Sequence, residues 1–334
     1  MTREELNKEK QSEIINEEKR KVRKKFVLSS AKVILFLVLF ATTFYFLNAN
    51  IFTKKIVVKE KRIVNEKIPD SFSGLKIVQF SDLHYGSTIF IDDVKNLVKL
   101  INSRNPDVVI FNGDLITPEY KITNYEKEKL TKTLANIEAS VGKYAVMGDE
   151  DNDNYSVLMK QANFTLLNNS YDLIYDDEET PIIIMGISSL LTANYNIAEA
   201  YGYFKEANSN SELYKIVAFH EPDLADYILD EYDADLLLAG HSHNGNIKLP
   251  FVGAIKRNYK GAEHYYDEME YVGNTPLYIS SGIGTNGAGV RFLCQPSINF
   301  FRLSNKWLFE SLKEIFFLFL CLFIYCNLSY LFFV

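Results

Sequence analysis

The sequence predicts an α/β fold in which helices cover a largely buried sheet. Short runs rich in Val, Ile and Leu recur from residue 75 onward, and segments with helical spacing of apolar residues separate the first of them. This alternation is typical of layered α/β domains. A third regularity is that an acid or a histidine follows most of the apolar runs, which places polar side chains along one edge of the expected sheet.

The first half of this region contains five expected elements in a row. Residues 75–80 predict a buried strand, because apolar residues dominate and a Ser-Asp pair follows. Residues 92–102 predict a helix, since their apolar side chains recur at three- and four-residue intervals. The apolar run 108–111 predicts the next strand. Residues 125–139 again have helical spacing, and 144–147 predict a third strand.

Later apolar runs predict three more strands, at 181–185, 214–219 and 234–239. Five strands of the whole set lead directly into an acid or a histidine: Asp82 with His84, Asp114, Asp149, His220, and His241 with His243. In open α/β sheets, ligands gather beyond the carboxyl ends of the strands. One such acid is often only a turn former, but five strand ends of this kind predict that the side chains converge.

These seven side chains offer three carboxylates, four imidazoles and no thiolate, a donor set that suits Mn, Fe or Zn. Seven donors are too many for one tetrahedral zinc. They suit two divalent metal ions that share a bridging carboxylate. Two metals about 3.5–4 Å apart can clamp a phosphoryl group and supply a hydroxide nucleophile at neutral pH. The residues therefore predict metal-assisted hydrolysis of a phosphate ester.

Composition excludes some other classes of protein. The 334 residues carry 43 acids and 36 bases, a formal charge of −7. This sign argues against a nucleic-acid-binding surface built on phosphate neutralisation. Of the three cysteines, Cys321 and Cys326 lie in an apolar run, so neither a disulfide framework nor a cysteine zinc site is expected.

The chain ends predict attachment to a membrane. Residues 26–52 are expected to form a transmembrane helix, because 33–51 carry no charge and about 20 apolar residues cross a bilayer. The basic leader, 1–25, is expected to stay cytoplasmic as a solvated helix or disordered tail. Residues 315–334 are also uncharged and predict a second span. The working domain, 55–305, would then be extracytoplasmic at the cell membrane.

Each of the two spans has an alternative. A buried core helix or a cleaved signal peptide could account for the first apolar segment. An interfacial or oligomer-forming helix could account for the second, although so apolar a sequence would expose a large patch in water.

The motifs around the predicted site resemble those of the calcineurin-like metallophosphoesterase family. They are Ser81-Asp82-Leu83-His84, Gly113-Asp114, Gly148-Asp149-Glu150-Asp151, Phe219-His220-Glu221-Pro222 and Gly240-His241-Ser242-His243. Residues 241–254, and 280–285 followed by Arg291-Phe292, also resemble its membrane-associated bacterial branch. The resemblance covers about residues 70–304 and implies a four-layer α/β/β/α sandwich.

The resemblance also implies a role for each metal ligand. Asp114 would bridge the two ions and take part in catalysis. A metal-bridging hydroxide would attack phosphorus in line with the leaving oxygen. The first ion would be held by Asp82, His84 and His243, and the second by Asp149, His220 and His241.

The third motif departs from the family pattern, which is Gly-Asn-His-Asp or Gly-Asn-His-Glu. Asp149 can still coordinate through oxygen, and its added charge should tighten metal binding. Glu150 stands where relatives have a histidine that protonates the leaving group, and an ionised glutamate is a poor acid. Glu150 is the second candidate catalytic residue beside Asp114, and we therefore expect reduced turnover or a preference for good leaving groups such as diphosphates. The alternative is a metal-binding pseudoenzyme.

The expected function is hydrolysis of a phosphodiester or diphosphate bond at the membrane surface. The expected partners are membrane lipid and a phosphate-ester substrate that is lipid-linked or derived from the envelope. Other residues have two interpretations each. Asn244 and Asn246 position solvent or substrate, or simply form a turn. Arg291 meets a phosphate oxygen or forms a structural ion pair. Asp151 and Asp153 are expected to lie in a solvated acidic loop.

Overall fold

The computed structural model describes residues 3–47, 53–152, 154–176, 180–206, 213–249, 251–255, 259–285 and 289–306. The chain forms two compact units, residues 1–50 and 51–334. The predicted second span, 315–334, lies outside the described residues.

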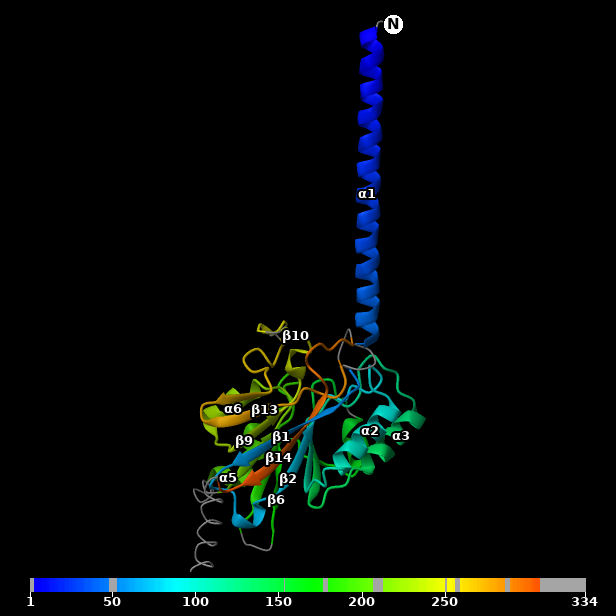
Figure 1. The fold of residues 1–334 in the computed structure, drawn as a ribbon. Coiled ribbons are helices and arrows are strands. Elements are labelled where there is room, and N and C mark those ends of the chain that lie inside the picture. The colour runs from blue at the N-terminus through cyan, green and yellow to red at the C-terminus, as the bar shows by residue number, and fades with distance from the viewer. Residues whose placement is uncertain are drawn as a thin grey trace, which may run out of the picture. The chain divides into compact units, whose positions relative to one another are not determined.

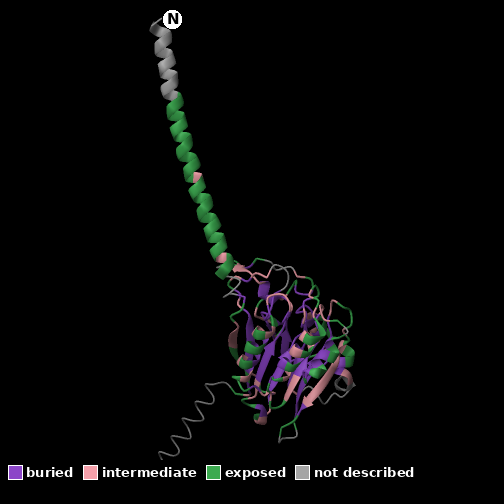
Figure 2. Cartoon of the chain, turned by 90° about the vertical axis from the view of Figure 1, so that its right-hand side faces the viewer, coloured by how far each residue is buried: buried purple, intermediate pink, exposed green. Residues whose placement is uncertain are grey.

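The first unit is one helix, α1 (Arg3–Leu47), which joins the charged leader to the apolar segment without a break. Within α1, Asn16–Leu47 is long and apolar enough to cross a membrane, by length and composition alone. Its described side chains are almost all exposed (Figure 2). Residues 33–47 of this helix carry no charge.

The second unit contains two six-stranded sheets (Figure 1). The first sheet has the order β1 (Val57–Val64), β14 (Ser297–Ser304), β2 (Lys76–Phe80), β3 (Val108–Phe111), β4 (Gly142–Ala145) and β5 (Thr165–Leu166). The second has the order β12 (Met269–Val272), β13 (Thr275–Ile279), β9 (Leu236–Ala239), β8 (Lys215–Ala218), β7 (Ile182–Gly186) and β6 (Ser170–Ile174). A short hairpin pairs β10 (Lys248–Leu249) with β11 (Gly253–Ala254).

Helices accompany both sheets. The first half of the unit contains the 3-10 turn η2 (Asp70–Phe72) and the helices α2 (Ile91–Asn102), α3 (Asn124–Ala135) and α4 (Tyr155–Gln161). The second half contains α5 (Ile197–Glu206), α6 (Leu224–Glu231) and the 3-10 turn η3 (His243–Gly245).

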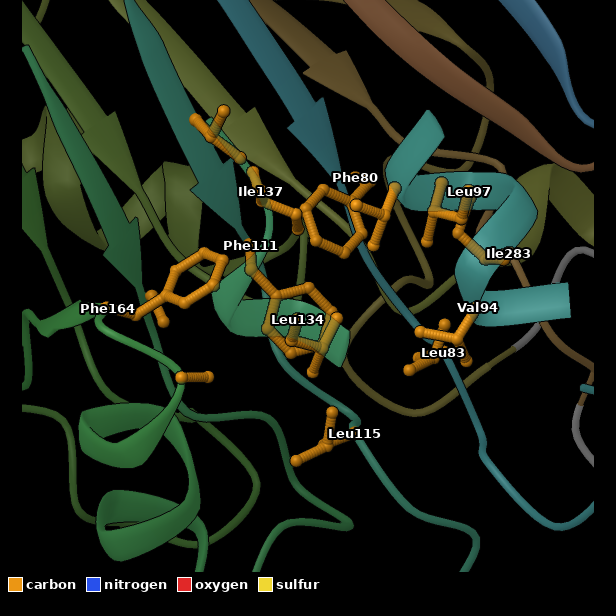
Figure 3. Packing of buried hydrophobic residues seen from close by; sticks show 14 of the residues in the cluster. Phe80, Leu83, Val94, Leu97, Phe111, Leu115, Leu134, Ile137, Phe164 and Ile283 are labelled. Carbon is orange, nitrogen blue, oxygen red and sulfur yellow. The ribbon is translucent and has the colours of Figure 1, made fainter. Parts of the chain in front are cut away.

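Alternation of side chains along the strands produces four layers. Val78 and Val109 belong to a core cluster shared with α2, α3 and α4, part of which is shown in Figure 3. Their neighbours Ile77 and Val108 point to the other face, into a cluster shared with the second sheet. A third cluster joins the far face of the second sheet to α5 and α6. This arrangement confirms the α/β/β/α sandwich.

Most strands of the two sheets are parallel to their neighbours, so their carboxyl ends meet at one edge. In the first sheet β2, β3 and β4 run parallel, and in the second sheet β7, β8 and β9 do so. Buried amides join the sheets at this edge. Gln79 Nε2 donates to Asn112 Oδ1 (3.1 Å), and Asn112 Nδ2 donates to the carbonyls of Phe219 (2.9 Å) and Leu238 (2.8 Å).

We predict that Asn112→Leu destabilises the protein by about 3 kcal/mol, because buried carbonyls on β9 and after β8 lose their donor. Denaturant unfolding of the metal-free protein measures this. Asn154→Leu is the matched control, since exposed Asn154 makes no capping hydrogen bond and should change stability by less than about 0.5 kcal/mol. Equal midpoints for the two variants would contradict a structural role for Asn112.

Candidate metal centre

The structure brings all seven predicted ligands to the common edge of the two sheets. They form two groups, and within each group the donor atoms lie within 4.8 Å of one another. One group is Asp82, His84 and His243, and the other is Asp114, Asp149, His220 and His241. The convergence expected from the strand ends is confirmed, while the role of each residue as a ligand remains a prediction.

Distances in the first group fit a single cation. Nε2 of His84 lies 3.2 Å from Nε2 of His243. Oδ1 of Asp82 lies 3.4 Å from the same His243 atom and 3.9 Å from His84 Nε2. Two ligands bound at ~2.0–2.1 Å to one tetrahedral or octahedral ion are roughly 3.0–3.4 Å apart. Two of the three distances lie in this range, and the 3.9 Å between Asp82 Oδ1 and His84 Nε2 would have to shorten for all three atoms to bind one ion.

The second group has the same dimensions. Oδ1 of Asp149 lies 3.2 Å from His220 Nε2 and 3.1 Å from His241 Nδ1. Asp149 Oδ1 and His220 Nε2 are buried and face each other at this distance. A cation between them would offset the charge of the carboxylate and bind the imidazole nitrogen.

Asp114 lies between the two groups. Its Oδ2 is 3.2 Å from His220 Nε2 and 3.8 Å from His84 Nε2, so one oxygen faces both sets of imidazoles. Its Oδ1 accepts a hydrogen bond from the backbone N–H of Glu150 (3.0 Å). This geometry suits the bridging position that the family resemblance implies.

The backbone turns sharply at the ligands. Five of the seven have a left-handed φ: Asp82 (50°), His84 (41°), Asp114 (60°), His241 (65°) and His243 (48°). Such conformations cost about 1–3 kcal/mol each and cluster at functional sites. A methyl group on Gly148 would collide with the Asp114 carboxylate, so only glycine fits there.

Backbone carbonyls orient two of the histidines. Nε2 of His241 lies 2.8 Å from the carbonyl of Lys260, which leaves Nδ1 facing Asp149. Nδ1 of His220 contacts the carbonyl of Asn112, which leaves Nε2 facing the site. Contacts of this kind fix the ring and the tautomer of a metal-binding histidine.

Charged side chains orient the other two histidines. Oε2 of Glu150 lies 3.2 Å from Nδ1 of His84, behind the donor nitrogen. An anion in this place makes the imidazole a stronger ligand. Arg291 donates to Nδ1 of His243 (3.1 Å). Burial, together with the charges of His84 and Arg291, lowers the pKa of His243 well below its usual value, so this ring stays neutral.

Arg291 has a role that the sequence did not suggest. Its side chain is fully buried, and besides His243 it donates to the carbonyls of Gly282 (3.2 Å) and Gly284. The guanidinium thus ties the 282–284 turn to a candidate ligand, and it acts as a positioning residue for His243.

Asp151 was expected in a solvated loop, and this prediction was wrong. Its carboxylate accepts backbone N–H groups from Asp114 (2.8 Å), Leu115 (2.9 Å) and Gly148 (2.9 Å). Burial and the charge of Asp114 raise the pKa of Asp151 to about 7. Asp151 therefore holds the loops that carry Asp114 and Asp149. The sequence signal for this role was the place of Asp151 as the fourth residue of the motif that begins at Gly148. Asp153 lies outside the described residues.

Asn244 and Asn246 directly follow the last histidine. Both have a left-handed φ, of 50° and 54°, as a turn requires. The Oδ1 atom of each is buried without a hydrogen-bond partner in the part of the chain that the structure describes. A role in positioning solvent or substrate therefore remains a prediction for both residues.

The site opens to solvent on one side. The side chains of Asp149, Glu150 and His241 are 22%, 19% and 13% exposed, respectively. His84 and His220 are fully buried. A substrate can therefore approach across the second group of ligands.

Comparisons with known proteins agree with this site. The model of the family described as calcineurin-like phosphoesterase matches residues 75–245. Uncharacterized metallophosphoesterase YkuE of Bacillus subtilis is 31% identical over 75% of this chain and 86% of its own length. Phosphodiesterase YaeI of Escherichia coli is 23% identical over 70% of this chain and 84% of its own. The chain also matches a transmembrane protein with metallophosphoesterase domain from Danio rerio at 26% identity, over 72% of this chain but 56% of that relative.

We predict that Asp151→Asn lowers the affinity for Mn²⁺ by 10- to 100-fold (roughly), because one amide oxygen cannot accept all three N–H groups and the ligand loops lose their anchor. Calorimetric titration of the chelator-treated protein measures this. Asp92→Asn is the control, since that side chain is 85% exposed on α2. If Mn²⁺ binds both variants equally, Asp151 does not position the ligands.

Proposed function

The chain belongs to the calcineurin-like phosphoesterase family, and on that basis we propose that it hydrolyses a phosphodiester or diphosphate bond with two divalent cations. The observation that carries this proposal is the pair of donor groups that meet at Asp114. The oxygen and imidazole donors suit Mn, Fe or Zn. Asp82, His84 and His243 would hold one cation.

The second cation would be held by Asp149, His220 and His241, with Asp114 shared between the two. When bound, two such cations offset the charge of the phosphoryl group and lower the pKa of coordinated water. The protein contributes rigid positions, because every candidate histidine is held at its second nitrogen. The exposed side of the site, at Asp149 and His241, admits the substrate.

Glu150 is the residue that limits the reaction in this proposal. It faces His84 Nδ1 and is itself partly exposed at the open side. A glutamate in this position replaces the family's histidine, which would supply a proton to the leaving oxygen. Substrates whose leaving group is stable as an anion, such as diphosphates, should therefore react best.

The pseudoenzyme alternative also rests on the third motif. Asp149, which replaces the usual asparagine, still places Oδ1 within 3.2 Å of His220 and 3.1 Å of His241. The complete donor set favours an active enzyme. The apolar helix α1 and the transmembrane relative support membrane attachment, and hence a lipid-linked or envelope-derived phosphate ester as substrate.

The test is release of nitrophenol from an aryl phosphodiester by the full chain in detergent with Mn²⁺. We expect metal-dependent release that Asp114→Asn lowers more than ~100-fold, since loss of a ligand exceeds the effect of losing an outer partner. No release by a wild-type protein that binds Mn²⁺ tightly would favour the pseudoenzyme.

We further expect Glu150→His to raise turnover on a phosphodiester with a poor leaving group by about tenfold or more, because a positioned acid contributes ~10²–10⁴. Glu128→His, on the exposed face of α3, controls for the added imidazole. The same substrate without metal sets the background. If turnover by the Glu150 variant does not rise, the interpretation of the third motif is wrong.

A further inference from the structure

The β10–β11 hairpin presents large apolar side chains to solvent. Phe251 is fully exposed, and Val252 and Ile255 are 58% and 59% exposed. Leu249, on β10, and Leu293, which is 52% exposed, complete the group. Leu293 belongs with the hairpin because the backbone N–H of Lys248 donates to the carbonyl of Phe292 (2.9 Å). We call Leu249, Phe251, Val252, Ile255 and Leu293 the hairpin surface.

The backbone conformation of two of these residues indicates that their side chains have a role other than stabilising the fold. Phe251 and Leu293 have φ values of 65° and 52°, in the left-handed region. Bulky residues seldom adopt this conformation, and glycine or asparagine fits it better. Two exposed turn positions thus hold large apolar residues at a conformational cost. Exposed apolar groups of this kind mark an interaction site.

The hairpin surface adjoins the metal centre. The turn that carries His243 leads directly into β10. On the other side, Cys294, next to Leu293, donates its thiol hydrogen to the carbonyl of His243 (3.2 Å). Both parts of the surface therefore flank one candidate ligand.

The same edge is where the chain enters the second unit. β1 begins at Val57, which pairs with Ser297 at the start of β14. Further along β14, Asn299 pairs with Gln79, near the end of β2 that leads to Asp82. Val57, Lys248 and Leu293 line one pocket. The entry point, the hairpin surface and the metal centre thus share one end of the sheets.

Chain length limits how far this end can lie from the end of α1. Thr53 is already buried in the second unit, and α1 ends at Leu47. At ~3.8 Å per residue, the chain between them spans at most roughly 23 Å. A domain of this size is roughly 50 Å across. If α1 crosses a membrane, Thr53 therefore lies within this reach of its end, and the edge with the hairpin surface is the one at which the chain enters the second unit.

We propose that the hairpin surface inserts into the lipid bilayer and seats the metal centre over a phosphate ester at the membrane surface. This rests on the proposed function and on α1 as a membrane span. Insertion is apolar in this proposal, and two of the described cations beside the surface are paired with acids. Lys248 lies 3.0 Å from Asp267, and Lys59 lies 2.9 Å from Glu268. Contact with lipid should accordingly be insensitive to salt.

The test places a fluorophore on the surface of the full chain, in vesicles of dibrominated phosphatidylcholine. The single tryptophan of the chain, Trp307, is first replaced by Trp307→Phe. Phe251→Trp is then compared with Tyr175→Trp, an exposed position just after β6. β6 ends where Ile174 pairs with Ile182, at the start of β7 and so far from the site edge. Figure 1 shows β10 and β6 toward opposite ends of the second unit.

We expect brominated lipid to quench emission from the Phe251→Trp protein at least twofold, in low and high salt alike, and to leave the Tyr175→Trp protein unchanged. Equal emission in brominated and ordinary lipid would overturn the proposal. A blue shift that depends on protein concentration but not on bromine would also overturn it, because a second copy would then cover the surface.

A second readout connects the surface to the reaction. Phe251→Ser with Val252→Ser should lower turnover of an aryl phosphodiester that bears a long alkyl chain, in phosphatidylcholine vesicles, by at least tenfold. Hydrolysis of the soluble aryl phosphodiester should not change, which shows that the variant folds. Equal loss on both substrates would contradict a docking role. Quenching needs no activity, so failure of the docking proposal and failure of the proposed function can be distinguished.

Discussion

The site depends on the fixed position of the Asp114 carboxylate, whose two oxygens contact different neighbours. This carboxylate is buried and lies close to other carboxylates. Oδ1 is held by the backbone of Glu150, and Oδ2 faces His84 and His220. The Asp151 carboxylate accepts hydrogen bonds from the backbone N–H groups of Asp114 and Gly148. Gly148 has no side chain, which leaves space for the Asp114 carboxylate. Carboxylates gathered so closely repel one another unless cations or histidines offset their charge.

The fold provides the rigidity that this arrangement requires. Parallel strands from two sheets end at one edge, and buried amides centred on Asn112 join those sheets there. The left-handed turns at Asp82, His84 and Asp114 are sustained because packed strands precede them. The same edge contains the start of β1 and the hairpin surface. The candidate metal centre, the point where the chain enters the second unit and the exposed apolar side chains therefore lie together.

Local sequence predicted α2, α3, the central strands and the seven strand-end residues, because hydrophobic periodicity and strand-end acids are local signals, but it did not predict α4, α5 or α6. It did not predict β1 beside β14, since that pairing joins distant parts of the chain and β1 is polar along its exposed positions. The helix expected at 125–139 ends at Ala135, where the backbone of Asn136 turns out of the helix. The partners of His84 and His243 depend on tertiary contacts that no local pattern contains.

The central claim is that seven strand-end side chains hold two cations. Anomalous diffraction from crystals of the protein grown with Mn²⁺, with metal content measured in parallel, tests it most directly. Our account predicts two peaks about 3.5–4 Å apart, one beside His84 and His243 and the other beside His220 and His241, with Asp114 touching both. A single peak, or peaks away from Asp114, would contradict it.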